Sequence, residues 1–204
     1  MDNGATLTIA AGKPLSVDTV LAEESVRGLL KAFGMEQHEE IMRNTPRRVV
    51  DAYVQLFTPP AFEPTIFPNL EKYDEMVLVR GIRFRSICEH HFLPFTGEAH
   101  VGYIPGGDVV GISKLARVVQ TFAGRPQRQE RLTVEIADWL TEQLNPVGAG
   151  VVLSAEHTCM TLRGVRADGA TTVTSAFRGA LADDRERRNE FLAMSDLGAR
   201  RSTA

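Results

Sequence analysis

The 204-residue chain has only two cysteines, no excess of positive charge and no long apolar run. Lys and Arg number 23 against 26 Asp and Glu, a net charge of -3, which argues against a protein that coats nucleic acid or an anionic membrane. No apolar stretch approaches the roughly 18 residues of a membrane helix, and Met1 to Leu15 lacks the regions of a secretory signal. We therefore expect a cytoplasmic protein with no nucleic-acid and no membrane partner.

The two cysteines lie in stretches that also hold three of the five histidines. Cys88 and His91 have a C-x-x-H spacing suited to binding one metal ion from a single loop, and Cys159 can supply a third ligand. A disulfide is the alternative, but without a secretory signal it would not persist. Two thiolates and one imidazole leave a fourth position open, as in a catalytic zinc site. The sequence therefore predicts Zn2+ as the cofactor.

Two further histidines, His90 and His157, lie near this predicted metal without being required as ligands. Because imidazole titrates near neutral pH, both are candidates for general acid and base catalysis. In the alternative interpretation, one of them completes a structural site with four protein ligands. Glu89 is predicted to be solvated or structural, since its neighbours occupy the chemical roles.

The first third of the chain has the pattern of a helical arm. Ser16 is expected to cap a helix that ends before Gly34, and Thr45-Pro46 is expected to begin a second helix that stops before Pro59. We assign residues 1–15 to a flexible N-terminus, 16–73 to the arm and its proline-rich connection, 74–194 to the catalytic domain, and 195–204 to a flexible tail.

The catalytic domain mixes strand and helix patterns, which indicates an α+β fold. Met76 to Ile87 is expected to be a strand that delivers Cys88 to a loop, and His100 falls on the surface parity of the next strand. Further expected elements are a short return over 109–112, a helix capped by Ser113, an amphipathic helix over 129–144 with Trp139 on its packed side, and a terminal helix from Asp184. A regular strand over 151–163 would place His157, Cys159 and Arg163 on one face.

A local basic island spans residues 111–131, with five basic side chains against Glu130. A helix N-terminus at Ser113, reinforced by Lys114 and Arg117, would bind phosphate, and Arg163 could add to it. The alternative is an exposed basic face, the interpretation favoured for Arg125, Arg128 and Arg131. Glu130 can accept the adjacent ring N–H and amino donors of guanine. Together these features describe a hydrolase acting on a purine nucleotide.

Six motifs now resemble one known family. Ser-x-Cys-Glu-His-His-Phe-x-Pro-Phe, Gly-Tyr-Ile-Pro, Gly-Ile-Ser-Lys-Leu-Ala-Arg, Arg-Pro-Gln-x-Gln-Glu-Arg-Leu-Thr, His-x-Cys-Met and Thr-x-Thr-Ser look like GTP cyclohydrolase I, in order, over about Glu39 to Phe191. The resemblance implies a tunnelling-type (T-fold) α+β fold with an antiparallel sheet and two helices packed on it. It also implies a homodecamer with active sites between subunits, and conversion of GTP to 7,8-dihydroneopterin triphosphate with release of formate, the first step of tetrahydrofolate and pterin biosynthesis.

The resemblance further implies residue roles. Cys88, His91 and Cys159 would bind zinc, whose water attacks C8 of GTP. His157 would protonate the imidazole ring of the base, and His90 would assist proton transfer. The remaining roles are guanine binding by Glu130 with Gln129, a position near the ribose and phosphates for Ser113, and triphosphate binding by Lys114, Arg117, Arg163 and, from a neighbouring subunit, Arg48. Some family members carry lysine where Asp51 stands here.

Two other functions compete with this interpretation. A hydrolase could open the guanine ring and stop at a formamidopyrimidine, or the chain could be a non-catalytic zinc- or GTP-binding module. A nucleobase deaminase is disfavoured, because the H-x-E with P-C-x-x-C signature is missing.

Overall fold

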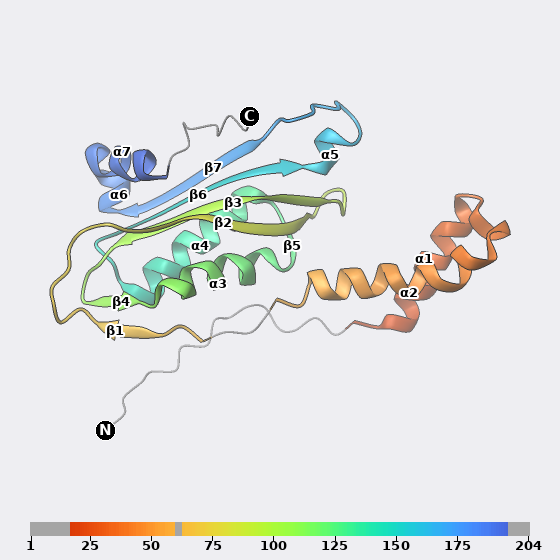
Figure 1. Cartoon of the computed structure of the whole chain (residues 1–204), viewed down its shortest axis with the longest axis horizontal. Helices are drawn as coiled ribbons and strands as arrows, with labels where there is room; N and C mark the ends of the chain where they lie inside the picture. The colour runs from red at the N-terminus through yellow and green to blue at the C-terminus, as the bar shows by residue number, and fades with distance from the viewer. Residues whose placement is uncertain (1–16, 60–62, 196–204) are drawn as a thin grey trace, which may run out of the picture. The chain divides into compact units, whose positions relative to one another are not determined.

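The computed structural model describes residues 17–59 and 63–195, which form an α+β protein (Figure 1). The described residues fall into two compact units that divide after Pro59. Within these residues, no helix is both long and apolar enough to cross a membrane.

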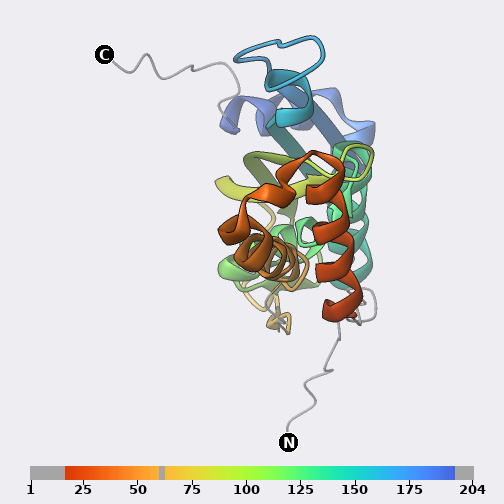
Figure 2. The ribbon, with the colours of Figure 1, turned by 90° about the vertical axis from the view of Figure 1, so that its right-hand side faces the viewer.

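The first unit is a helical arm, as predicted. It contains α1 (Thr19–Ala32), the 3-10 turn η1 (Met35–Gln37) and α2 (Glu39–Leu56), which Figure 2 views nearly end-on with α1 packed beside it. Asp18 caps α1 by accepting a hydrogen bond from the Leu21 amide at 2.9 Å. Ser16, the expected cap, lies outside the described residues.

The predicted start of the second helix at Thr45-Pro46 is wrong. The helix begins at Glu39, and Pro46 lies inside it and is buried. Glutamates at positions 39 and 40 favour the earlier start, because acidic side chains stabilise a helix N-terminus. Pro46 removes one backbone hydrogen bond of the helix interior but does not end it.

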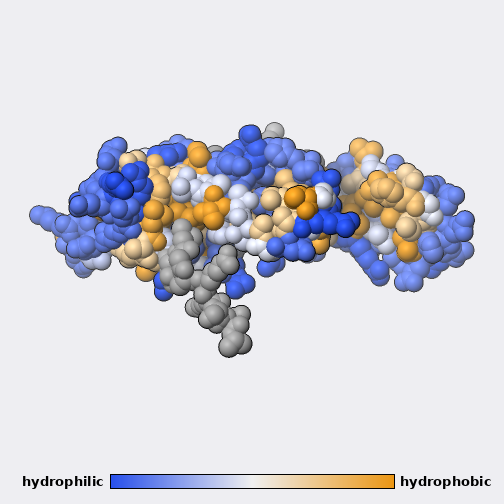
Figure 3. Space-filling model, turned by 90° about the horizontal axis from the view of Figure 1, so that it is seen from above, coloured by the Kyte–Doolittle hydropathy of each residue, from blue (hydrophilic) through white to orange (hydrophobic). Residues whose placement is uncertain are grey.

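Large apolar side chains of the arm remain exposed in this chain. None of the residues of α1 is buried, and Val20 and Phe33 are each 69% exposed. Figure 3 shows the hydrophobic surface of the arm in orange at the right. A contiguous apolar face of this kind is typical of a surface that binds another protein.

The second unit is built on a five-stranded sheet with the order β5-β2-β3-β6-β7. Its long strands are β2 (Val77–Cys88), β3 (Pro94–Ile104), β6 (Gly148–His157) and β7 (Thr172–Gly179), which pair with one another in antiparallel orientation. The two-residue β5 (Pro126–Gln127) runs parallel to the end of β2. The predicted antiparallel sheet is therefore confirmed, with one short parallel strand at its edge.

A separate two-stranded sheet pairs β1 (Ile66–Pro68) with β4 (Asp108–Val110). The short return expected at 109–112 thus ends at Val110 and pairs with a strand from the connection, not with the strand before it. Tyr103 assists, because its hydroxyl accepts a hydrogen bond from the Val110 amide at 3.0 Å.

Helices cover both faces of the five-stranded sheet. On one face, α3 (Ile112–Ala123) and α4 (Gln129–Leu144) enclose the main core, and on the other lie α6 (Ala180–Asp183) and α7 (Arg185–Met194) (Figure 1). The predicted packed residues of α4 are all at most 4% exposed: Leu132, Ile136, Trp139, Leu140 and Leu144. Phe191 of α7 packs across Gly150, where an added Cβ would lie 2.9 Å from its ring.

The prediction that His100 is a surface residue is wrong. Its parity is opposite to that of Val101, as expected, and it pairs in register with Val152. That second face is not open to solvent, because Val152 belongs to the cluster under α6 and α7. His100 is consequently only 7% exposed.

Candidate metal and nucleotide site

A tight loop after β2 presents the first two candidate metal ligands. The Cys88 amide donates to the Leu93 carbonyl, and the Phe92 amide donates to the Cys88 carbonyl, each at 2.8 Å. Phe92 has a φ of 56°, the left-handed conformation that lets the chain reverse within so few residues. Cys88 is thereby fixed at the end of a strand, and His91 lies on the turn.

The third candidate ligand does not lie on a strand, contrary to the regular strand expected over 151–163. β6 ends at His157, and α5 (Thr158–Thr161) is a helical turn that carries Cys159. The Thr158 hydroxyl donates to the Pro94 carbonyl at 2.6 Å, which ends the extended conformation. Arg163 follows this turn and is exposed. His157, Cys159 and Arg163 therefore do not share one strand face.

The predicted ligands nevertheless converge. One ligand atom from each of Cys88, His91 and Cys159 lies within 4.8 Å of the other two, and the Cys88 sulfur is 3.9 Å from His91 Nδ1. Both cysteines are free thiols, so the disulfide alternative is not adopted. Two sulfur donors and one imidazole fit a zinc ion and leave room for a non-protein ligand. Neither His90 nor His157 belongs to this group.

The surroundings of Cys159 favour the protonated form of its thiol. Burial raises its pKa, and the neighbouring Cys88 raises it further, while the charge of Arg163 lowers it in part. A metal ligand must be a thiolate, so metal binding at this site displaces a proton.

His157 is fixed by two contacts. Its ring stacks on that of Phe95, with centroids 4.5 Å apart and planes 5° from parallel, and its Nε2 is 2.8 Å from Oε1 of Gln129. Burial lowers the pKa of His157, and the charge of Glu130 raises it.

The surroundings of Gln129 determine which nitrogen of His157 carries the proton. Nε2 of Gln129 faces three oxygens, namely the Leu153 carbonyl at 3.3 Å, the Thr172 carbonyl at 2.8 Å and the Thr174 hydroxyl at 3.1 Å. The amide oxygen is therefore the atom turned to the imidazole, and Nε2 of His157 donates to it. Nδ1 is left as the nitrogen that can take up a proton.

Gln129, the residue predicted to bind guanine together with Glu130, is enclosed by protein groups. It is 1% exposed, and its amide group is occupied by protein partners. The sequence does not reveal the buried position of Gln129, because only the fold brings β6 and β7 against the start of α4. Glu130 beside it is exposed in the first turn of α4 and has no ion-pair partner among the described residues. Its carboxylate is free to accept two donors from a ligand.

The basic island is largely neutralised by acidic partners. Arg125 contacts Glu135 at 2.6 Å, and Arg128 and Arg131 contact Glu89 at 2.8 and 2.5 Å. Ion pairs thus replace the exposed basic face expected for these three arginines. Glu89 precedes the basic island in the sequence, and Glu135 follows it on α4. Among residues 17–59 and 63–195, no acidic side chain forms an ion pair with the predicted phosphate ligands Lys114, Arg117 and Arg163.

The predicted phosphate ligands on α3 lie in its first two turns. Gly111 is the N-cap, so the prediction of Ser113 as the cap is wrong, and Ser113 is an exposed residue of the first turn. Lys114 donates to the Glu63 carbonyl at 2.6 Å, and Arg117 is exposed. These side chains surround the helix end that favours anions.

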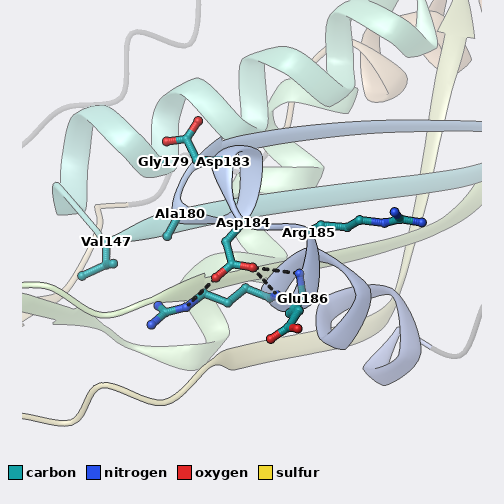
Figure 4. A pocket seen from close by; sticks show the side chains of 8 residues that line it. Val147, Gly179, Ala180, Asp183, Asp184, Arg185 and Glu186 are labelled. Carbon is teal, nitrogen blue, oxygen red and sulfur yellow. Dashed lines mark hydrogen bonds and ion pairs between the residues drawn. The ribbon is translucent and has the colours of Figure 1, made fainter.

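A surface depression at the start of α7 is separate from these residues. It is lined by Val147, Gly179, Ala180 and residues 183–187, and none of the predicted site residues lines it. Asp184 accepts from the amides of Glu186 at 2.8 Å and Arg187 at 3.3 Å, as Figure 4 shows. The predicted terminal helix from Asp184 is confirmed, and its N-terminus is filled by that carboxylate.

Three clustered side chains that could hold a metal ion, together with an oriented imidazole two residues from one of them, are typical of a metal-dependent enzyme. The chain belongs to the GTP cyclohydrolase I family, whose model matches residues 22–196.

Curated relatives support the same assignment. The protein named GTP cyclohydrolase 1 of Bacillus subtilis (strain 168) is 50% identical over 176 residues, covering 83% of this chain and 92% of that protein. Those of Bacillus pumilus and Aquifex aeolicus are 49% and 45% identical, covering 87% and 88% of this chain and 96% and 98% of their own lengths. The apo structure of the archaeosine synthase QueF-Like gives a TM-score of 0.43 at 23% identity over 51% of this chain and 93% of that one, too weak a likeness to add to the assignment.

Proposed function

We propose that the protein is a zinc-dependent, cytoplasmic GTP cyclohydrolase I, a hydrolase of cyclic amidine C–N bonds. It opens the imidazole ring of GTP, releases C8 as formate and recloses the product as 7,8-dihydroneopterin triphosphate. The observation that carries the proposal is the convergence of Cys88, His91 and Cys159 beside His157 in a chain of this family.

The metal site suits this reaction. Zinc bound by Cys88, His91 and Cys159 would supply Lewis acidity and lower the pKa of water to about 7. The protein's own contribution is to bring together donors from the end of β2, the turn after it and α5.

His157 is the proposed acid for ring opening. Its Nε2 proton is directed to Gln129, so Nδ1 takes up and delivers the proton that the base needs as its ring opens. The negative charge of Glu130 favours the protonated ring, against the opposing effect of burial. His90, whose side chain is 63% exposed, is proposed to assist proton transfer from the solvent side.

Substrate recognition divides between one carboxylate and several cations. Glu130 is proposed to bind the guanine ring N–H and amino group together, a pair of donors that adenine lacks. Lys114, Arg117 and Arg163 are proposed to bind the triphosphate, with Ser113 near the ribose and phosphates.

The placement of these groups supports a homo-oligomer with sites between subunits. α3 has 12 residues and is therefore about 18 Å long. Its far end leads into β5, which pairs with Ile87 and Cys88, whereas Ser113 and Lys114 lie at the start (Figure 1). A single chain thus separates its metal group from its phosphate-binding turn by roughly the length of that helix, about 18 Å.

We propose that neighbouring subunits of a decamer bring the two groups together. The exposed apolar side chains of α1 would be covered in such an assembly. Arg48 of α2 is proposed to reach the triphosphate of a neighbour. Asp51 forms an ion pair with Arg47 at 3.5 Å, so it does not replace the phosphate-binding lysine of some relatives.

The proposal is tested by incubating zinc-loaded protein with GTP. Formate and a product that becomes fluorescent after oxidation are expected, and mass spectrometry separates this product from an unclosed formamidopyrimidine. A zinc-loaded preparation that leaves GTP intact would contradict the proposal and favour the non-catalytic module. Cys159→Ser is the matched control, expected to lose both zinc and turnover while the circular dichroism spectrum is retained.

A further inference from the structure

Several residues of the family-like motifs have no part in the chemistry proposed above. In Cys-Glu-His-His this residue is Glu89, and in Arg-Pro-Gln-x-Gln-Glu-Arg they are Arg125, Gln127 and Arg131. The structure joins all four in one polar network between the metal loop and the start of α4.

Glu89 is the centre of this network, which favours the structural over the solvated alternative of the prediction for this residue. Its Oε1 accepts from Nε of Arg128 at 2.8 Å, and its Oε2 accepts from Arg131 at 2.5 Å. The Glu89 side chain is only 27% exposed. Its backbone amide also donates to the Gln127 carbonyl at 3.0 Å. Glu89 is therefore held by both its backbone and its side chain.

The network continues into the interior. Arg131 donates through Nε to Oε1 of Gln127 at 2.7 Å, and the fully buried Gln127 donates to Glu135 at 2.7 Å and to the Phe122 carbonyl at 3.0 Å. Glu135 also contacts Arg125. Charge-assisted hydrogen bonds are stronger than neutral ones, and partial burial limits their screening by salt. This hydrogen-bond network is therefore a rigid support for the metal loop.

The support connects two parts of the proposed active site. Glu89 lies between the metal ligands Cys88 and His91. Arg128 and Arg131 immediately flank Gln129 and Glu130 on α4. A movement of either part changes the distance between the metal group and the proposed guanine-binding carboxylate.

We propose that Glu89 is a positioning residue, whose clamp by Arg128 and Arg131 sets the geometry of the metal loop and its register with α4. This inference rests on the proposed function. A metal site whose ligands are held in place binds its ion more tightly, and loss of an outer partner typically weakens metal binding by about tenfold to hundredfold.

The test uses full-length, metal-free protein titrated with Zn2+ against a chromophoric chelator. Glu89→Gln keeps the size of the side chain and removes its charge, and we expect zinc affinity to fall by about tenfold or more. Glu98→Gln is the matched control, because the Glu98 carboxylate pairs with Arg83 on the sheet at 3.7 Å and does not contact the metal loop within the described part of the chain. Its zinc affinity is expected to equal that of the unmodified protein.

A double-variant cycle identifies the partner. If Glu89 acts through Arg131, the double variant Glu89→Gln/Arg131→Gln weakens zinc binding by less than the two single changes combined. Visible absorption of the cobalt-substituted protein adds a readout of ligand geometry, and its bands are expected to shift in Glu89→Gln. A folded Glu89→Gln protein with unchanged zinc affinity and an unchanged cobalt spectrum would overturn the inference.

Instability of Glu89→Gln would not remove the test. Arg128→Gln deletes the more exposed partner and is expected to weaken zinc binding to a smaller extent, and an unchanged affinity there would also count against the clamp. Because the titration contains no GTP, its failure is separate from failure of the proposed reaction. If the inference about Glu89 fails, the variants bind zinc like the unmodified protein and formate still forms. If the proposed reaction fails, the unmodified protein releases no formate from GTP.

Discussion

Replacement of Gln129 by methionine separates a positioning role from a substrate-binding one. The side chain is 1% exposed and surrounded by the Leu153 and Thr172 carbonyls, the Thr174 hydroxyl and His157. Methionine has a similar volume but can make none of these hydrogen bonds. The change therefore removes the contacts while largely preserving the packing.

The size of the effect follows from those four contacts. At about 1 kcal/mol net for each hydrogen bond, the free energy of unfolding should fall by about 3 to 4 kcal/mol. For a domain of this size that corresponds to a drop in Tm of roughly 6 to 16 °C. His157 also loses the acceptor that orients its ring, and misplacement of a catalytic group by about 1 Å can lower kcat by about a hundredfold.

The assay is formate release from GTP at saturating zinc, well below the lowered Tm. We expect kcat to fall by about tenfold to hundredfold with little change in KM, because the buried side chain does not face the substrate. Thr174→Val is the control: it removes one oxygen from the amide of Gln129 but leaves the contact with His157. Its Tm should fall modestly while kcat is retained. An increased KM with unchanged kcat and Tm in Gln129→Met would refute the reasoning and restore a direct guanine contact.

Three further predictions concern protons, charge and assembly. Because its pKa is raised, Cys159 should release a proton when zinc binds, and zinc affinity should decrease as the pH falls. Calorimetry in buffers of different ionisation enthalpy should report at least about one proton released per zinc ion at pH 7. Burial lowers the pKa of His157 and the charge of Glu130 raises it. Glu130→Gln should therefore lower the pKa of His157 further, which NMR titration of the histidines in the metal-free protein would detect. An unchanged pKa would show that the two groups are not coupled. Arg48→Gln should raise the KM for GTP without changing the oligomeric mass measured by light scattering, and a normal KM would exclude Arg48 from the phosphate site.

The sequence predicted best where a periodic pattern and local spacing decide the structure. The pattern predicts the 129–144 helix and its buried residues correctly, because apolar residues at helical spacing over 16 residues fit a helix and not a strand. The positions of Cys88 at the end of a strand and of His91 on the following turn come close to the predicted loop, because an apolar, β-branched run ends at this point. The helical arm was also predicted, although the start of α2 was misplaced because proline at the first position and proline inside a helix look alike in sequence.

The errors occurred where tertiary contacts decide. The strand over 151–163 ends at His157 because Thr158 bonds to Pro94, a residue 64 positions earlier. His100 is buried because a C-terminal helix pair covers the second face of the sheet, which the alternation of one strand cannot reveal. For Glu89 the sequence could not decide between a solvated and a structural role, because its partner Arg131 lies 42 positions away.

The ion pairs of Glu89 and Glu135 also change the electrostatic argument for an assembled site. Local composition suggested five basic side chains near one anion, but three of them are already paired with carboxylates. The proposed triphosphate binding then depends on Lys114, Arg117, Arg163 and Arg48. Within one chain the first two lie at the end of α3 opposite the metal group. In the proposed reaction, one GTP molecule contacts the guanine-binding carboxylate of Glu130, the metal and the phosphate ligands at the same time. A single chain with this arrangement should therefore bind GTP weakly, and tight binding should require the oligomer. Dilution that dissociates the assembly should therefore abolish GTP turnover before it releases zinc, because all three metal ligands come from one chain.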